Sequence, residues 1–129
     1  MGFLLAQAHM SARKRADEAL AGVGLDMKGF AALATLASSG PTSQRKLSEL
    51  IRMDPATMVD VIDSLEAKKH LERRRNPDDR REYALHLTAR GRALFDRAEK
   101  AILEAEKQSL GDLQPAQVRT LMGLLEKIQ

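Results

Sequence analysis

The sequence predicts a mainly helical α+β fold in which four helices, a β-hairpin and two more helices follow one another along 129 residues. Apolar residues recur at steps of three and four over most of the chain, which is the spacing of amphipathic helices. The spacing changes to two only around residues 71–88, where a hairpin is expected. Aromatic residues make up only 3% of the chain, so aliphatic side chains have to fill the core. Such a composition favours helices.

Length and composition are those of one folding unit, residues 1–129. No cysteine occurs, which excludes a disulfide framework, a thiolate metal site and a thiol redox switch. The apolar start of the chain is too short for a signal peptide, and no stretch approaches the roughly 20 apolar residues that span a bilayer. We therefore expect a cytoplasmic protein that does not interact with a membrane.

Residues 3–21 and 27–38 form the first two predicted helices. The apolar side of the first consists mostly of alanine, with charged residues between the apolar positions. The second carries Phe30 and Leu33 on one side, and Pro41 lies just beyond its end. Both helices are therefore amphipathic.

A third helix of about nine residues is expected to start after Thr42 or Ser43, either of which can cap its first turn. Its apolar residues at helical spacing should face inward. They are Leu47, Leu50 and Ile51.

The next junction is the most informative part of the sequence. Asp54 is a strong N-cap, and Pro55 occupies the first helical position, where a backbone N–H is not needed. Only Arg52 and Met53 separate this helix from the previous one. Two helices joined by such a short turn form a helix-turn-helix unit.

The fourth helix, residues 55–69, is predicted to have two unlike faces. Its inward residues fall within one arc: Met58, Val61, Ile62 and Leu65. Its outward side chains are short: Ala56, Thr57, Asp60, Asp63, Ser64 and Ala67. A face of short side chains lets a helix lie close to another surface, as a helix in a DNA major groove must. His70 is expected to be a surface residue at the end of this helix.

A hairpin is predicted from residues 71–75 and 82–88. Tyr83, Leu85 and Leu87 point to one side because they alternate with polar or small residues. Residues 68–81 hold seven Lys or Arg and three acidic residues, a local charge of +4, whereas the remainder of the chain carries −1. A basic hairpin after a helix-turn-helix makes a winged helix-turn-helix, in which the helix enters the major groove and the hairpin reaches the backbone or the minor groove.

Two helices complete the chain. Thr88 should cap a long helix that ends near Ser109, and the last helix spans about residues 115–128. The apolar seam of the long helix consists of Leu94, Ala98, Ala101, Ile102 and Ala105. A monomer of this size would leave such seams exposed, so a second copy is expected to cover them.

Several of these stretches resemble the multiple-antibiotic-resistance-regulator (MarR) family of winged-helix repressors. The resemblance covers essentially the whole chain, and its most specific part is an Asp-x-Arg turn at residues 79–81 followed by Leu-Thr-x-x-Gly at residues 87–91. It implies a DNA-binding lobe at residues 43–90 and dimerisation helices at residues 1–22 and 92–129. It also implies a homodimer on a pseudo-palindromic operator.

The resemblance and the helix faces together predict which residues contact DNA. They are Ser43, Gln44, Pro55, Ala56, Thr57, Asp60, Ser64, Lys68, Arg73, Arg75, Asp79, Arg80 and Arg81. The resemblance implies that Arg80 or Arg81 is the arginine of the hairpin that enters the groove, and that Asp79 orients Arg81. The residues implied to meet mostly phosphates are Lys68, Lys69, Arg73, Arg74 and Arg75. Asp60 is a departure from this pattern, because an acid repels phosphates and can help only by accepting from a cytosine amino group.

A small aromatic or anionic effector is implied to release the repressor from DNA. The family's effector cleft is lined by the first, second and fifth helices. On that basis, the residues expected to line it here are His9, Arg13, Phe30 and Phe95.

Two other classes of function compete with a DNA-binding regulator. A winged helix can serve as a protein-interaction module without sequence-specific DNA binding. An enzyme would have to rely on Asp78 and Asp79, which are better explained as turn formers between arginines. The three histidines, His9, His70 and His86, lack the spacing of a metal site. We expect no cofactor, no metal and no catalytic activity.

Overall fold

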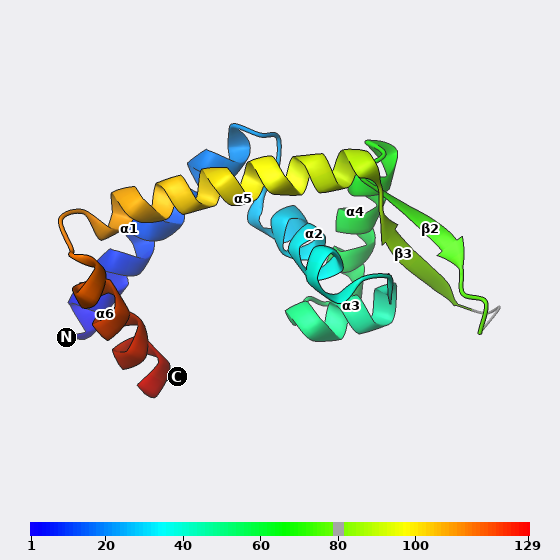
Figure 1. Cartoon of the computed structure of the whole chain (residues 1–129). Helices are drawn as coiled ribbons and strands as arrows, with labels where there is room; N and C mark the ends of the chain where they lie inside the picture. Colours follow the sequence, from blue (N-terminus) through cyan, green and yellow to red (C-terminus); the bar gives the residue numbers. More distant parts are fainter. Residues whose placement is uncertain (79–81) are drawn as a thin grey trace.

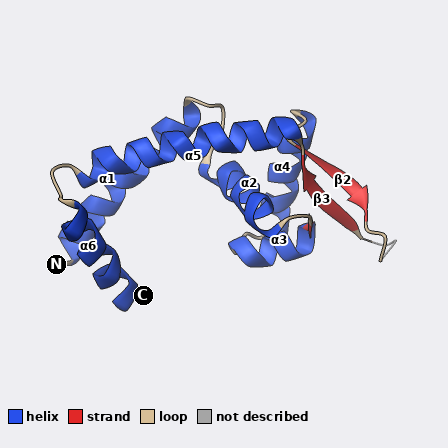
Figure 2. Ribbon diagram, in the orientation of Figure 1, coloured by secondary structure: helices blue, strands red, loops and turns tan. Residues whose placement is uncertain are grey.

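The computed structural model describes residues 1–78 and 82–129, and its elements follow the predicted order (Figure 1). The helices are α1 (Gly2–Ala21), α2 (Met27–Ser39), α3 (Gln44–Ile51), α4 (Pro55–Ala67), α5 (Ala89–Leu110) and α6 (Pro115–Lys127). The strands are β1 (Thr42–Ser43), β2 (Leu71–Arg75) and β3 (Tyr83–Leu87). Figure 2 shows the β2–β3 hairpin projecting from one end of an otherwise helical molecule.

The long helix α5 connects the two ends of the molecule. Near its start it packs against α2 and the sheet, and farther along it runs beside α1 (Figure 1). Helix α6 and both termini lie at the end opposite the hairpin. Within the described residues, no helix is both long enough and apolar enough to cross a membrane.

A short strand adds to the predicted hairpin. The sheet order is β1-β3-β2 with antiparallel neighbours, and Thr42 of β1 pairs with Leu85. The hairpin register pairs Leu71 with Leu87 and Arg75 with Tyr83. Because β1 has only two residues, no alternation of apolar and polar residues could reveal it in the sequence.

The hydrophobic core lies in the lobe made by α2, α3, α4, the sheet and the start of α5. Its buried members are Ala32, Leu33, Leu36, Leu47, Met58, Ile62, Leu65, Leu71, Leu85 and Leu94. Helix α1 buries only Leu20, and α6 buries no residue within this single chain. The predicted inward arc of α4 is therefore confirmed. The seam of α5 was expected to be exposed in a monomer, and this is wrong for Leu94, Ala98 and Ala105, which the single chain already buries because α1 and α2 pack against α5. Apolar residues in the N-terminal half of α1 and along α6 are exposed.

Two predicted inward residues are exposed instead. Leu50 was expected to face the core from α3, but it is 51% exposed. Tyr83 shares the side of Leu85 as predicted, yet it is 48% exposed because it lies at the far end of the hairpin, opposite Arg75. In both cases the residue lies on the predicted side of its helix or strand. It is exposed because the hydrophobic core does not reach that part of the element.

Candidate nucleic-acid interface

The helix-turn-helix is shaped by two local caps and one unusual residue. Ser43 Oγ accepts a hydrogen bond from Lys46 N at 3.2 Å and so caps α3. Arg52 then adopts a left-handed conformation with φ 53°, which ends α3 and redirects the chain. The turn between α3 and α4 is therefore determined by local interactions, between residues only a few positions apart in the sequence.

Helix α4 begins at the predicted cap. Asp54 accepts from Thr57 N at 3.0 Å and from Thr57 Oγ1 at 2.7 Å. These hydrogen bonds, the one from the Thr57 side chain first, lower the pKa of Asp54 below its usual value. The carboxylate is thereby kept charged at the positive end of the helix dipole.

The outer side of α4 is open, as predicted. Pro55, Ala56, Asp60 and Ser64 are exposed and Thr57 is half-buried, whereas the opposite side is packed into the core. Lys68 is also exposed, one position after the last residue of α4. Helix α4 contacts β2, so its outer side and the hairpin belong to the same end of the molecule (Figure 1). An exposed helix with short side chains beside a projecting hairpin is the geometry that winged-helix proteins present to duplex DNA.

Arg73 links the hairpin to both helices of the unit. Its guanidinium donates to Asp63 Oδ1 at 2.8 Å and to Glu66 of α4, and it reaches Gln44 Oε1 of α3 at 3.4 Å. The hydrogen bond with Asp63, followed by the charge of Glu66, raises the pKa of Arg73. In this structure the Arg73 guanidinium is thus engaged within the protein, and the side chain is only 28% exposed. Its predicted contact with DNA stays a prediction.

The hairpin tip is described only in part. Arg75 is exposed at the end of β2, Asn76 N donates to Glu82 O at 3.0 Å, and Asp78 N donates to Asn76 Oδ1 at 3.0 Å. Arg80 and Arg81, one of which is predicted to enter the groove, and Asp79, which is predicted to orient Arg81, lie outside the described residues.

The four predicted effector-contacting residues fall into two separate places. Phe30 of α2 and Phe95 of α5 stack with ring centroids 5.9 Å apart. His9 and Arg13 instead lie on the exposed side of α1, where Arg13 pairs with Asp17 at 3.0 Å. A single chain therefore does not bring the aromatic pair and the basic pair together.

His70 was predicted to be a surface residue, and this prediction is wrong. Its side chain is buried near the start of α5, and its Nδ1 has no hydrogen-bond partner in residues 1–78 and 82–129. Burial first, and then the charges of Arg90, Lys68 and Arg97, lower the pKa of His70. The sequence could not reveal this burial because it depends on how closely α5 approaches the chain between α4 and β2.

The histidines do not form a metal centre in the described part of the chain. No group of three or more His, Cys, Asp or Glu residues is close enough there to hold a metal ion. His9 lies on α1, His70 between α4 and β2, and His86 on β3.

A helix-turn-helix followed by a basic antiparallel hairpin defines a winged-helix protein, and comparisons with known proteins agree. The MarR family model matches residues 25–83. The chain is 31% identical to the HTH-type transcriptional repressor Mb2911 of Mycobacterium bovis, over 99% of this chain and 92% of that protein. The chain belongs to the MarR family.

Solved structures support the same assignment. The Mycobacterium tuberculosis MarR family protein Rv2887, solved in complex with DNA, aligns with a TM-score of 0.84 and 30% identity, covering 99% of this chain and 96% of that one. Bordetella bronchiseptica BpsR, from a study of how 6-hydroxynicotinic acid regulates its DNA binding, aligns with a TM-score of 0.82 and 28% identity, covering 98% and 96%. The chain spans 60% of the length of another relative, a putative transcriptional regulatory protein for the hcr operon of Thauera aromatica, at 31% identity over 99 residues.

Proposed function

We propose that this protein is a homodimeric transcriptional repressor that binds a pseudo-palindromic DNA operator and is released by a small effector. One observation carries the proposal: the exposed, short-chained side of α4 and the basic hairpin share one end of the molecule. The DNA complex of Rv2887, a relative with the same fold, supports it. We propose that the residues predicted above as DNA contacts serve this function, with residues 43–90 as the DNA-binding lobe.

The two parts of this surface have different tasks. Ala56, Thr57 and Asp60 project from α4 and would meet base edges in the major groove. Lys68, Arg75 and the hairpin tip would neutralise phosphates, which supplies affinity and sets the register without specifying sequence. Specificity would therefore come mainly from α4 and from the arginine at the tip.

A second copy of the chain would cover the apolar residues that the single chain leaves exposed at the end opposite the hairpin. These residues are Met1 just before α1, Phe3, Leu4, Leu5 and Met10 of α1, Leu103 of α5, Leu113 just before α6, and Met122, Leu124, Leu125 and Ile128 near the C-terminus. A large exposed apolar surface on one end of a small protein is typical of an oligomer interface. Residues 1–22 and 92–129 would thus form the dimer, and two-fold symmetry would set the spacing of the two α4 helices.

An effector would act on that spacing. BpsR supports a small aromatic acid as the class of ligand. The stacked Phe30 and Phe95 offer an aromatic wall, and α1 of the second protomer could bring its copies of His9 and Arg13 to the same cleft. An effector that binds one helix spacing better than the other shifts the population away from the DNA-binding form.

No catalytic activity is proposed, because members of a family of transcriptional regulators work through binding. The protein would act in the cytoplasm, where its DNA target is found. Neither a cofactor nor a metal is needed for this function.

The proposed function is tested by measuring DNA binding over a range of salt concentrations, first on random duplex DNA and then on fragments selected from a random pool. We expect affinity to fall steeply with salt and the selected fragments to be pseudo-palindromic. A flat salt response would contradict the proposal and favour the alternative, a winged-helix module that binds other proteins. Sedimentation of the free protein should give a dimer, and a Leu124→Glu variant should shift it toward monomer.

A further inference from the structure

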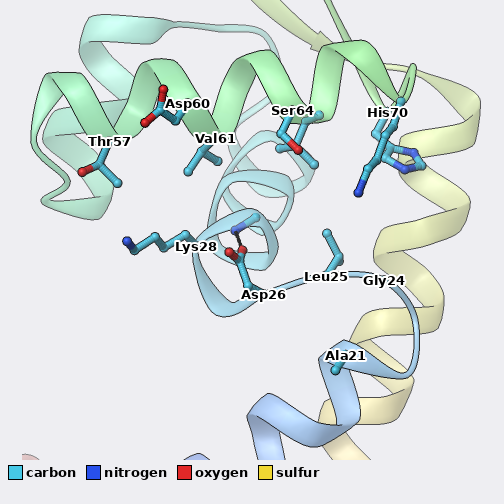
Figure 3. Close-up of a pocket in the computed structure, with 13 residues that line it drawn as sticks. Ala21, Gly24, Leu25, Asp26, Lys28, Thr57, Asp60, Val61, Ser64 and His70 are labelled. Carbon is cyan, nitrogen blue, oxygen red and sulfur yellow. Dashed lines mark hydrogen bonds between the residues drawn. The ribbon is translucent and has the colours of Figure 1, made fainter.

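A cleft of about 550 Å³ runs between the start of α2 and one flank of α4 (Figure 3). Its lining includes the apolar Leu25 and Val61, and the cationic Lys28 of α2 and Lys68 just after α4. The hydroxyl-bearing residues Thr57 and Ser64 line the α4 flank as well. Polar and cationic groups thus line a strip along a helix that is proposed to enter a major groove.

The acidic side chains around this cleft either accept hydrogen bonds as helix caps or point away from Lys28. Asp26 Oδ1 accepts from Gly29 N at 2.8 Å as the cap of α2, and Asp54 is held by Thr57 as the cap of α4. The Asp60 carboxylate points away from Lys28 in Figure 3. Among the described residues, Lys28 has no ion-pair partner within 4.0 Å, and its side chain is exposed.

The charge of Lys28 also acts on Asp54, the residue that caps the start of α4. The hydrogen bonds from Thr57 lower the pKa of Asp54, and the charge of Lys28 adds to that effect. Lys28 and Thr57, a residue in the first turn of α4, also line the same cleft. An anion at this edge would be attracted by the positive charge of Lys28.

We propose that Lys28, together with Lys68, binds DNA backbone phosphates along this flank of α4, so that the DNA interface extends to α2, outside residues 43–90. The inference rests on the proposed DNA-binding function. A helix in the major groove lies between two phosphate strands. Asp63 and Glu66 of α4, which do not line this cleft, contact Arg73 of the hairpin, and Arg73 also reaches Gln44 at the start of α3. The hairpin and α3 are therefore on another flank of α4 than Lys28. Lysine fits this task because its flexible stem lets a point charge follow a phosphate without fixed geometry.

The experiment compares the salt dependence of binding to a random-sequence duplex for the wild type, Lys28→Ala and Lys28→Arg. Each phosphate contact contributes about 0.9 to the slope of log affinity against log salt, so the loss of one contact per protomer lowers the slope of a dimer by about 1.8. Lys28→Ala should show this decrease and Lys28→Arg should not. Lys100→Ala, which removes an exposed lysine of α5, is the matched control and should keep the wild-type slope.

Further measurements separate the outcomes. Lys28→Ala should weaken binding to random and selected duplexes by the same factor, because phosphates carry no sequence. Its thermal melt should match the wild type, since the side chain is exposed. An unchanged slope in Lys28→Ala, or a loss confined to the selected duplex, would overturn the assignment. A wild-type protein with no salt-dependent DNA binding would instead overturn the proposed function itself.

Discussion

The carbonyl oxygen of His70 lies where a side chain on Gly91 would have to be: a Cβ added to Gly91 would be 1.8 Å from that oxygen and 2.8 Å from the carbonyl carbon. The same carbonyl accepts a hydrogen bond from Thr88 N at 3.2 Å, and Thr88 Oγ1 donates to Lys69 O at 2.7 Å. Through these contacts the start of α5 is joined to the chain between α4 and the hairpin.

Gly91→Ala should destabilise the protein by about 3 kcal/mol, near the upper end of the cost of overpacking, because the obstructing atoms belong to the backbone. The free energy of unfolding from urea denaturation measures the effect. Arg92→Ala replaces the adjacent exposed residue and should be close to neutral. Equal stability of the two variants would show that α5 can move away from His70 at little cost.

His70 should make stability depend on pH in a defined direction. Because burial lowers the pKa of His70 from the usual 6.5, the folded protein binds fewer protons there than the unfolded chain. His70 therefore lowers the free energy of unfolding as soon as pH falls through its pKa in the unfolded chain. This loss of stability levels off once pH is below the pKa of His70 in the folded protein. His70→Phe, which cannot titrate, should gain stability relative to the wild type as pH is lowered from about 7.5 to about 5. A difference between the two proteins that stays constant over this range would contradict the assignment.

Arg73 and Arg74 are neighbours with unequal partners, and they offer a matched pair of variants. Arg73 binds Asp63 and Glu66 and is 28% exposed, whereas Arg74 pairs with Glu72 alone among the described residues and is 62% exposed. Arg73→Ala should cost about 1–2 kcal/mol of unfolding free energy, since charge-assisted hydrogen bonds between elements are lost. Arg74→Ala should cost about 0.5 kcal/mol or less, as for an exposed ion pair. If the two variants were equally stable, Arg73 would not hold the hairpin against α4.

Arg81→Ala tests the arginine that the sequence motif assigns to the groove. It should weaken operator binding by about 1–3 kcal/mol, the usual cost of losing an arginine contact with a base, and it should leave the dimer intact. A gel-shift titration on the selected operator, with sedimentation as the check on assembly, measures both. Wild-type affinity would mean that another residue of the tip enters the groove.

Much of the fold was predictable because the signals are local. Asp54 and Pro55 start α4, Thr88 Oγ1 accepts from Gly91 N at 3.0 Å to start α5, and the predicted hairpin is present as β2 and β3. An N-cap acts within three residues, so its effect can be inferred without knowing the rest of the structure. The end of α4 was predicted two residues too late, at Lys69. The helix stops at Ala67, and Lys69 is left-handed with φ 63°, a conformation that is unusual for any residue with a side chain.

The candidate site was predictable in outline for the same reason. The 100° turn of an α-helix sorts residues 55–67 into an inner and an outer side, so the exposed side of α4 followed from the spacing alone. The proposed place of Lys28 beside α4 could not be derived in this way, because α2 and α4 approach each other only in the folded chain.

By itself, then, the order of residues determined which segments are helical, where they begin, and that a basic hairpin follows a helix-turn-helix. Only the tertiary structure decided that β1 joins the sheet, that His70 is buried, that Arg73 is held by two acids, and that Gly91 cannot bear a side chain. Caps and periodicities are hydrogen bonds and packing between near neighbours, whereas these four features depend on atoms that the chain brings together from distant positions.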